Sequence, residues 1–190
     1  MLLLVGLGNP TPNSQNNRHN IGFKIVDAIN QKFGLSKQKP KFKGLLTTGN
    51  IGDKKIYAIK PLTFMNNSGI CIRELLEYFK IDAEDVIVFH DDLDIEFGKI
   101  KAKFGGSSAG HNGIASIDKF IGKDYSRVRI GIGHPKQKKK VNNHVLEDFK
   151  EDEEEKIKEI TDSIVKLIPT LIDKKIDLFS SKVNQNLNGI

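Results

Sequence analysis

The sequence has few of the residues that form covalent cross-links or membrane spans. Its 190 residues include a single cysteine, Cys71, which excludes an intramolecular disulfide and fits a reducing cytoplasm. No apolar run approaches the roughly 20 residues of a membrane-spanning helix. The apolar N-terminus lacks the basic region and small-residue cleavage site of a signal peptide. We therefore expect a cytoplasmic protein with no membrane partner.

Acidic residues are outnumbered, and the charges are unevenly placed. The chain has 30 Lys and Arg against 24 Asp and Glu, a net charge of +6. This balance permits an acidic partner such as nucleic acid but does not establish one. One basic run, made of Lys136, Lys138, Lys139 and Lys140, is typical of a solvated loop or an auxiliary RNA contact. The acidic run at 147–155 is typical of the first turns of a helix.

Hydrophobic periodicity predicts alternating strands and helices. The expected strands are 2–7, 44–50, 55–60, 86–89, 100–104 and 128–132, and the expected helices are 20–33, 67–79, 114–121 and a terminal section beginning near 157. Pro169 should kink or split that terminal section. Strands that alternate with helices indicate an α/β fold. We expect one domain over residues 1–190, with a mixed, largely parallel central sheet flanked by helices.

The first strand is followed by GLGNPTPNSQNNRHNIGF, which begins like a nucleotide-binding loop. A dinucleotide fingerprint needs a third small residue three positions after its second glycine, Gly8. That position is occupied by Thr11, followed by Pro12, and no suitable acidic residue ends a second strand. A nucleotide-dependent enzyme is therefore disfavoured.

Polar side chains follow four of the expected strands. Ligand crevices in parallel sheets lie beyond the carboxyl ends of the strands, and Asn9, Asn66, Asp91 and Asn112 all occupy such places. A single asparagine in a turn usually caps its own backbone. Four polar groups that converge on one sheet edge indicate a functional site.

His19 is the nearby side chain suited to proton exchange near neutral pH. A histidine base commonly relies on a carboxylate to fix its tautomer, and Asp91 could supply it. With no serine or cysteine placed as a nucleophile, the spacing favours a histidine that activates water while asparagine amides hold a developing oxyanion. The spacing alone leaves a structural role for His19 equally open.

Five motifs then carry a family resemblance. Over residues 2 to about 150 the chain contains, in this order, VGLGNP…RHNIGF, KPLTFMNNSG, HDDLD, KIKAKFGGSSAGHNGIASI and RVRIGIGHP. Together these motifs closely resemble bacterial peptidyl-tRNA hydrolase. The resemblance implies an enzyme that cleaves the ester between a peptide and the 3′-terminal ribose of tRNA and so recycles tRNA. It also implies a monomer that needs no metal, cofactor or obligatory protein partner.

The resemblance assigns roles to individual residues. His19 is implied as the catalytic base and Asp91 as its partner. The implied substrate-binding residues are Asn9, Met65, Asn66 and Asn112, and the implied tRNA-phosphate contacts are Lys101, Lys103 and Arg129. His111, after a glycine-rich stretch, is a further candidate RNA contact. The glycines of GLGNP are expected to let the backbone turn tightly.

Several alternatives remain at this level. Asp91, Asp92 and Asp94 suggest a carboxylate metal site, but alternate residues of an extended segment need not converge, and Asp94 is expected to hold the next turn. A non-catalytic RNA-binding protein of the same fold is the main functional alternative. The chain also departs from the usual family pattern, with Thr11 after the proline, Ser14 at a tyrosine position and Asn17 before the RHN motif.

Overall fold

The fold is built on one seven-stranded sheet. The computed structural model describes residues 1–135 and 141–189, and its strands lie in the order β2-β3-β4-β1-β5-β7-β6. The strands are β1 Leu2–Gly6, β2 Lys39–Lys41, β3 Gly44–Ile51, β4 Lys54–Pro61, β5 Val86–Asp92, β6 Ile100–Phe104 and β7 Ser126–Gly131. The central strands β4, β1, β5 and β7 run parallel, whereas β2, β3 and β6 pair antiparallel with their neighbours. The expected α/β class with a mixed sheet is confirmed.

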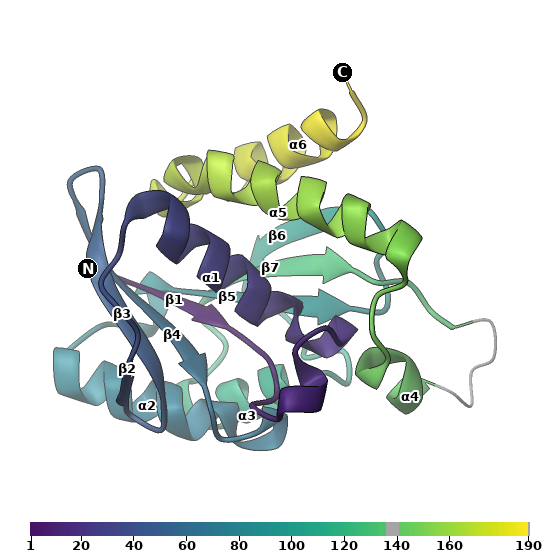
Figure 1. The fold of residues 1–190 in the computed structure, drawn as a ribbon. Helices are drawn as coiled ribbons and strands as arrows, with labels where there is room; N and C mark the ends of the chain where they lie inside the picture. The colour runs from purple at the N-terminus through teal and green to yellow at the C-terminus, as the bar shows by residue number, and fades with distance from the viewer. Residues whose placement is uncertain (136–140, 190) are drawn as a thin grey trace.

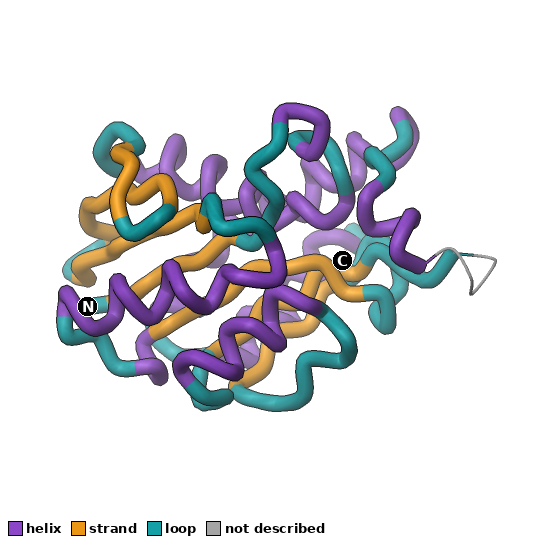
Figure 2. Tube along the Cα trace, turned by 90° about the horizontal axis from the view of Figure 1, so that it is seen from below, coloured by secondary structure: helices purple, strands orange, loops and turns teal. Residues whose placement is uncertain are grey.

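Helices cover both faces of this sheet. They are α1 Ile21–Phe33, α2 Ser68–Phe79, α3 Asn112–Ile121, α4 Val141–Leu146, α5 Glu151–Ile172 and α6 Ile176–Leu187. Figure 1 shows α1, α5 and α6 on one face of the sheet and α2 and α3 on the other, and Figure 2 shows the strands between the helices from below. In the described part of the chain, no helix has the length and apolarity needed to span a membrane.

The first strand shows why the sequence forms a three-layer structure. Every residue of β1 is buried, and successive side chains point to opposite faces. Leu2 and Leu4 join the apolar cluster under α1, α5 and α6, while Leu3 and Val5 join the cluster under α2 and α3. A continuous apolar run is what a central parallel strand requires, because both of its faces are covered.

Glycines allow α1 to approach the sheet closely. A Cβ atom on Gly22 would collide with backbone atoms of Leu7 and Phe89, and one on Gly6 would collide with the backbone of Gly22. Neither Gly6 nor Gly8 has a positive φ. Their role is therefore close packing rather than the tight turn that we expected. This packing brings the start of α1, and the turn before it, to the carboxyl end of β5.

The secondary structure differs from the expectation at Pro169, at strand β2 and at helix α4, which was not expected from the sequence. The expected split at Pro169 is wrong, because helix α5 continues through this residue to Ile172. The helix ends only before residues 173–175, where Lys174 has φ of 61°. The apolar side chains on both sides of the proline, Ile168 and Leu171, are fully buried, and this packing outweighs the missing backbone hydrogen bond. Strand β2 was missed because its three residues, which include Pro40, are all exposed. The predicted lysine run at 136–140 lies outside the described residues.

Candidate active site

The parallel strands bring the predicted polar residues to one edge of the sheet. Asn9 follows β1, Met65 and Asn66 follow β4, and Asp91 lies near the end of β5. Because β4, β1 and β5 are parallel neighbours, their carboxyl ends meet at the same edge. His111 joins them as the residue before α3. The convergence expected from the sequence is therefore present for Asn9, Asn66 and Asp91. Asn112 also reaches the site, but not from the carboxyl end of a parallel strand, because β6 runs antiparallel to β7 and ends at the opposite edge.

Two histidines share one oxygen of Asp91. His19 Nδ1 lies 2.8 Å from Asp91 Oδ1, and His111 Nε2 lies 3.0 Å from the same atom. The Asp91 side chain is only 2% exposed. Burial alone raises the pKa of Asp91, but the charges and hydrogen bonds of His111 and His19 outweigh burial and hold this pKa well below its usual range. Asp91 is therefore a carboxylate that accepts both bonds.

The start of α3 fixes the tautomer of His111. The Ile114 N–H donates to His111 Nδ1 at 3.3 Å, so the proton of the neutral ring is on Nε2, which donates to Asp91. His19 likewise donates from Nδ1 to the carboxylate, which leaves the lone pair on its Nε2. Among the described residues, none forms a hydrogen bond with His19 Nε2. This nitrogen is the one that can accept a proton from substrate or water.

Asn9 is held in place by Asn20, a residue that the sequence motifs did not single out. The Asn20 side chain accepts from Asn9 N and donates to Asn9 O, each at 2.9 Å. The Asn9 side-chain oxygen accepts from Met65 N at 2.9 Å. The Asn9 amide nitrogen is thereby oriented as a donor. The signal for Asn20 was its place directly after His19, at the first residue before α1.

Two cavities border His19. One, of about 370 Å³, is lined by residues that include Asn9, His19, Met65, Asn66 and Asn112. The other, of about 290 Å³, is bounded by His19, Asp91, His111 and by residues of α4. The first cavity thus brings together the predicted base and all four predicted substrate-binding residues.

The basic residues predicted to contact tRNA phosphates lie on β6 and β7. Lys101 pairs opposite Arg129 in the ladder, and Lys103 opposite Arg127, so all four side chains project from one face. Arg129 Nε bonds Asp92 Oδ2 at 2.7 Å. Burial, followed by the charges of Arg129 and Arg127, lowers the pKa of Lys103. Because Arg129 and Arg127 each pair with a carboxylate, the net positive charge of this face comes from Lys101 and Lys103, and it favours an anionic ligand.

Arg127, to which the sequence motifs assigned no role, supports the glycine-rich loop. Its side chain is 1% exposed, pairs with Asp118 at 2.7 Å and donates to the carbonyl of Ser107 at 2.8 Å. It therefore ties the loop at 105–110 to α3 and β7. The only sequence signal was its alternation with Arg129 in RVRIG.

The aspartates of HDDLD do not form the carboxylate cluster that was considered as a metal site. Asp92 pairs with Arg129, and Asp94 pairs with His134 at 2.8 Å. The described residues contain one group of three possible metal ligands, His19, Asp91 and His111, whose ligand atoms lie within 4.8 Å of one another. The hydrogen bonds given above already account for that spacing.

Comparisons with known proteins identify the family of this chain. The family model for peptidyl-tRNA hydrolase matches residues 3–189. The peptidyl-tRNA hydrolase of Pelagibacter ubique is 79% identical over 97% of this chain and 99% of that protein, and the one of Gluconobacter oxydans is 45% identical over 96% and 97%. The crystal structure of peptidyl-tRNA hydrolase from Acinetobacter baumannii superposes with a TM-score of 0.91 at 34% identity, covering 97% of this chain and 94% of that one. The chain belongs to the peptidyl-tRNA hydrolase family.

Proposed function

We propose that this protein hydrolyses the ester bond between a peptide, or an N-blocked aminoacyl group, and the 3′-terminal ribose of tRNA, with His19 as the base. The observation that carries the role of His19 is the bond from its Nδ1 to the buried Asp91 carboxylate. This bond leaves Nε2 available on a ring that lines a cavity together with Asn9, Asn66 and Asn112. A pure binding site needs no such arrangement, so a non-catalytic RNA-binding protein of this fold is disfavoured.

The reaction follows from these positions. His19 Nε2 takes a proton from a water molecule as the water oxygen attacks the ester carbonyl. Asp91 stabilises the imidazolium that forms, and His111 holds the Asp91 carboxylate from its other side. Side-chain amides of Asn9, Asn66 and Asn112 donate to the developing oxyanion or orient the water. The imidazolium then returns its proton to the departing ribose oxygen, which leaves free tRNA and a free peptide carboxylate.

The two ends of the substrate call for different surfaces. Met65 and the exposed apolar side chains of Phe64 and Leu146 line the cavity beside His19, where they suit the acyl portion. Arg129 lies on β7, one strand away from the strand of Asp91, and Lys101 and Lys103 lie on β6, two strands away. These cations suit the tRNA phosphates. The RNA contact of His111 stays a prediction. Its ring is mostly buried against Asp91, which leaves little of its surface for RNA.

The test of this function is the release of free tRNA from N-acetyl-aminoacyl-tRNA, measured with EDTA present. His19→Ala should lower kcat by about 10²–10⁴, the range for removal of a general base. Affinity for tRNA should stay within about threefold of wild type, because binding to phosphates uses other residues. Near-normal turnover by His19→Ala would refute the mechanism, and binding without turnover by the wild type would favour the RNA-binding alternative.

We further propose that residues 1–190 act as one domain and as a monomer in the cytoplasm, with no cofactor. Helices α5 and α6 support the first point, because they complete the cover over the same sheet that carries the site. The other points are expectations from the single cysteine and from the family resemblance.

A further inference from the structure

Helix α4 forms a wall of the site but has little core of its own. It is six residues long and contains no buried residue. Isolated helices of this length are unstable in water. Nevertheless Asn142 and Val145 line both cavities beside His19, and Leu146 lines one of them. Some interaction from outside the helix must hold this wall in position.

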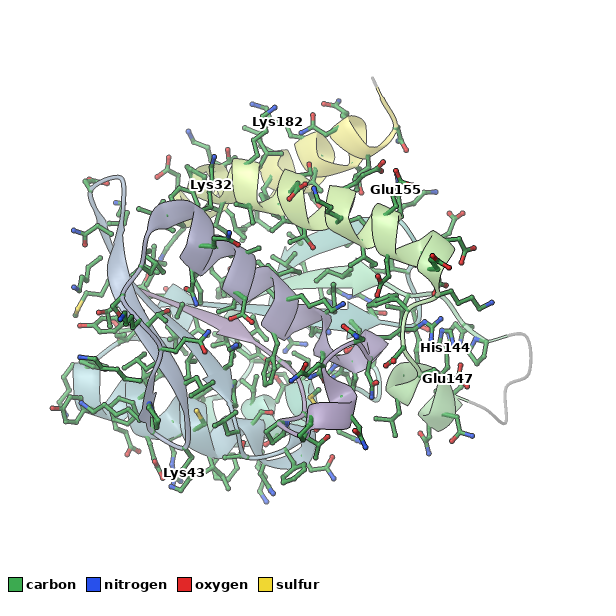
Figure 3. All side chains as sticks on the ribbon, in the orientation of Figure 1. Lys32, Lys43, His144, Glu147, Glu155 and Lys182 are labelled. Atoms are coloured by element: carbon green, nitrogen blue, oxygen red, sulfur yellow. The ribbon has the colours of Figure 1, made fainter. Side chains whose placement is uncertain are left out.

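The side chain of Arg18, directly before His19, supplies such an interaction. It is 3% exposed, and its Nη1 donates to the carbonyls of His144 and Glu147 at 3.4 and 3.3 Å. Figure 3 labels His144, in α4, and Glu147, directly after α4. The last carbonyls of a helix carry its negative dipole end, which favours a cation there. The guanidinium therefore caps α4.

The same guanidinium also reaches the first turn of α5. Its Nη2 bonds Glu153 Oε2 at 2.7 Å, and that carboxylate also accepts from Lys150 N at 2.8 Å. Glu147 offers a second carboxylate, but at 3.8 Å and mostly exposed. The Arg18 guanidinium carbon lies 5.5 Å from the centre of the Phe149 ring, which adds a cation–π contact. One buried side chain thus joins the end of α4 to the start of α5.

Backbone pairing runs beside these side-chain interactions. Arg18 N donates to Glu147 O at 3.0 Å, and Phe149 N donates to Asn16 O at 3.2 Å. Asn17 and Asp148 form an isolated antiparallel bridge between these bonds. The segment before the catalytic base and the segment between α4 and α5 are therefore in register with each other, although about 130 residues separate them in the sequence.

We propose that Arg18 is a positioning residue that holds α4 as the wall of the acyl-binding cavity and thereby sets the affinity for the acyl portion of the substrate. This inference rests on the proposed function. Arg18 touches no reacting atom in this assignment. The orientation of His19 comes mainly from Asp91, on another element, so removal of the Arg18 interactions should weaken binding more than chemistry.

Two substitutions test the interaction from its two sides. Arg18→Lys keeps the charge but removes the planar fork that reaches two carbonyls and a carboxylate at once. Glu153→Gln keeps an acceptor for Lys150 N but removes the charge that pairs with Arg18. The matched control is Arg73→Ala, which removes an exposed arginine that pairs with Glu77 on α2 at 3.8 Å. The control should behave as wild type.

Two measurements are made on each variant. Steady-state kinetics on N-acetyl-aminoacyl-tRNA should show KM raised by roughly tenfold or more, with kcat within about threefold of wild type. Hydrogen exchange of the free protein should accelerate by at least about tenfold in residues 141–149, with protection of β1 and β5 unchanged. If Arg18→Lys fails to fold, Glu153→Gln decides the question.

Three outcomes would overturn the inference. Unchanged KM and exchange in both variants would mean that α4 is held by other residues. A fall in kcat alone would mean that Arg18 acts through His19. Faster exchange throughout the sheet would mean that Arg18 serves the whole fold. Failure of the wild-type protein to release tRNA would refute the proposed function instead, and the exchange measurement would still test whether Arg18 holds α4.

Discussion

At the scale of single residues, the site depends on the protonation of Asp91 and of the two histidines, His19 and His111, that contact one of its carboxylate oxygens. His111 receives a backbone N–H on Nδ1 and must donate from Nε2, while His19 donates from Nδ1. Asp91 is acceptor-only and satisfies both rings. The arrangement keeps the His19 lone pair directed away from Asp91.

Asp91→Asn should therefore damage catalysis far more than folding. An amide has nearly the same shape, but its nitrogen would present a donor to rings that already donate, so His19 would change its tautomer or its orientation. We expect kcat to fall on the order of 10²–10⁴, as for removal of a general base. The thermal midpoint should shift by only a few degrees.

The matched control for this change is Asp162→Asn, which removes an exposed carboxylate that pairs with Lys158 on α5. Turnover and melting temperature of the control should equal those of wild type. Asp91 would have to be reassigned as a structural residue if its asparagine variant lost thermal stability and activity together.

At the scale of elements, β6 and β7 form a basic face beside the site. Lys101 and Lys103 are alternate residues of an edge strand, and both lie on the face that carries Arg129. Lysines on edge strands also serve solubility, so their position alone does not assign them to tRNA. Lys103 differs from a lysine on an isolated edge, because partial burial and the charges of two neighbouring arginines lower its pKa.

Replacement of both Lys101 and Lys103 by alanine should raise KM for full-length peptidyl-tRNA. Cleavage of a minimal ester without the 5′ end should hardly change, because phosphate contacts position the substrate without taking part in the chemistry. The slope of log affinity against log salt should become shallower by about 0.7–0.9 for each phosphate that the variant no longer neutralises. Affinity titrations at several salt concentrations measure this slope.

A matched control comes from the opposite edge of the sheet. Lys39 and Lys41 are also alternate residues of an edge strand, β2. The double alanine variant at these positions removes the same total charge without touching β6. Equal effects of the two double variants would indicate a general electrostatic contribution and would remove the phosphate assignment from Lys101 and Lys103.

At the scale of the whole molecule, a buried histidine links stability to pH. His90 Nδ1 donates to Asp91 O at 2.7 Å, while its Nε2 is buried without a partner among the described residues. Burial, followed by the charge of His111, lowers the pKa of His90 well below its usual value. The folded protein therefore keeps His90 neutral at a pH where the unfolded chain binds a proton.

Stability should consequently fall as the pH drops below about 6.5, the ordinary pKa of histidine. One extra proton on the unfolded chain changes the free energy of unfolding by at most about 1.4 kcal/mol per pH unit. The depressed pKa of Asp91 acts in a separate window, since its contribution is present above about pH 3.9 and disappears only at lower pH. Urea unfolding between pH 7.5 and 5 measures the change in a range that lies above the Asp91 window.

His90→Asn is the variant that checks this assignment, because asparagine can still donate to a carbonyl but does not titrate. Its free energy of unfolding should depend less on pH than that of wild type, even if it is lower at pH 7.5. Identical pH dependence in the two proteins would show that His90 contributes nothing to acid sensitivity.

Local patterns in the sequence were sufficient for most of the architecture. The run from Leu2 to Val5 is apolar at every position, which only a strand covered on both faces explains well. The polar residues that follow the strands indicated the edge at which the site would form. Local patterns failed where packing overrode them, as at Pro169, and where an element is too short and exposed to leave a hydrophobic signal, as in β2.

The sequence by itself determined the type and order of the longer elements, though not of β2 or α4, and the chemistry available at one edge of the sheet, because these depend on residues close together in the chain. Only the tertiary structure decided how that chemistry is arranged. Asp91 receives His19 across 72 positions, and Arg18 reaches Glu153 across 135. Interactions over such separations leave no periodic pattern in the sequence. They exist only once packing of the helices against both faces of the sheet has brought these residues together.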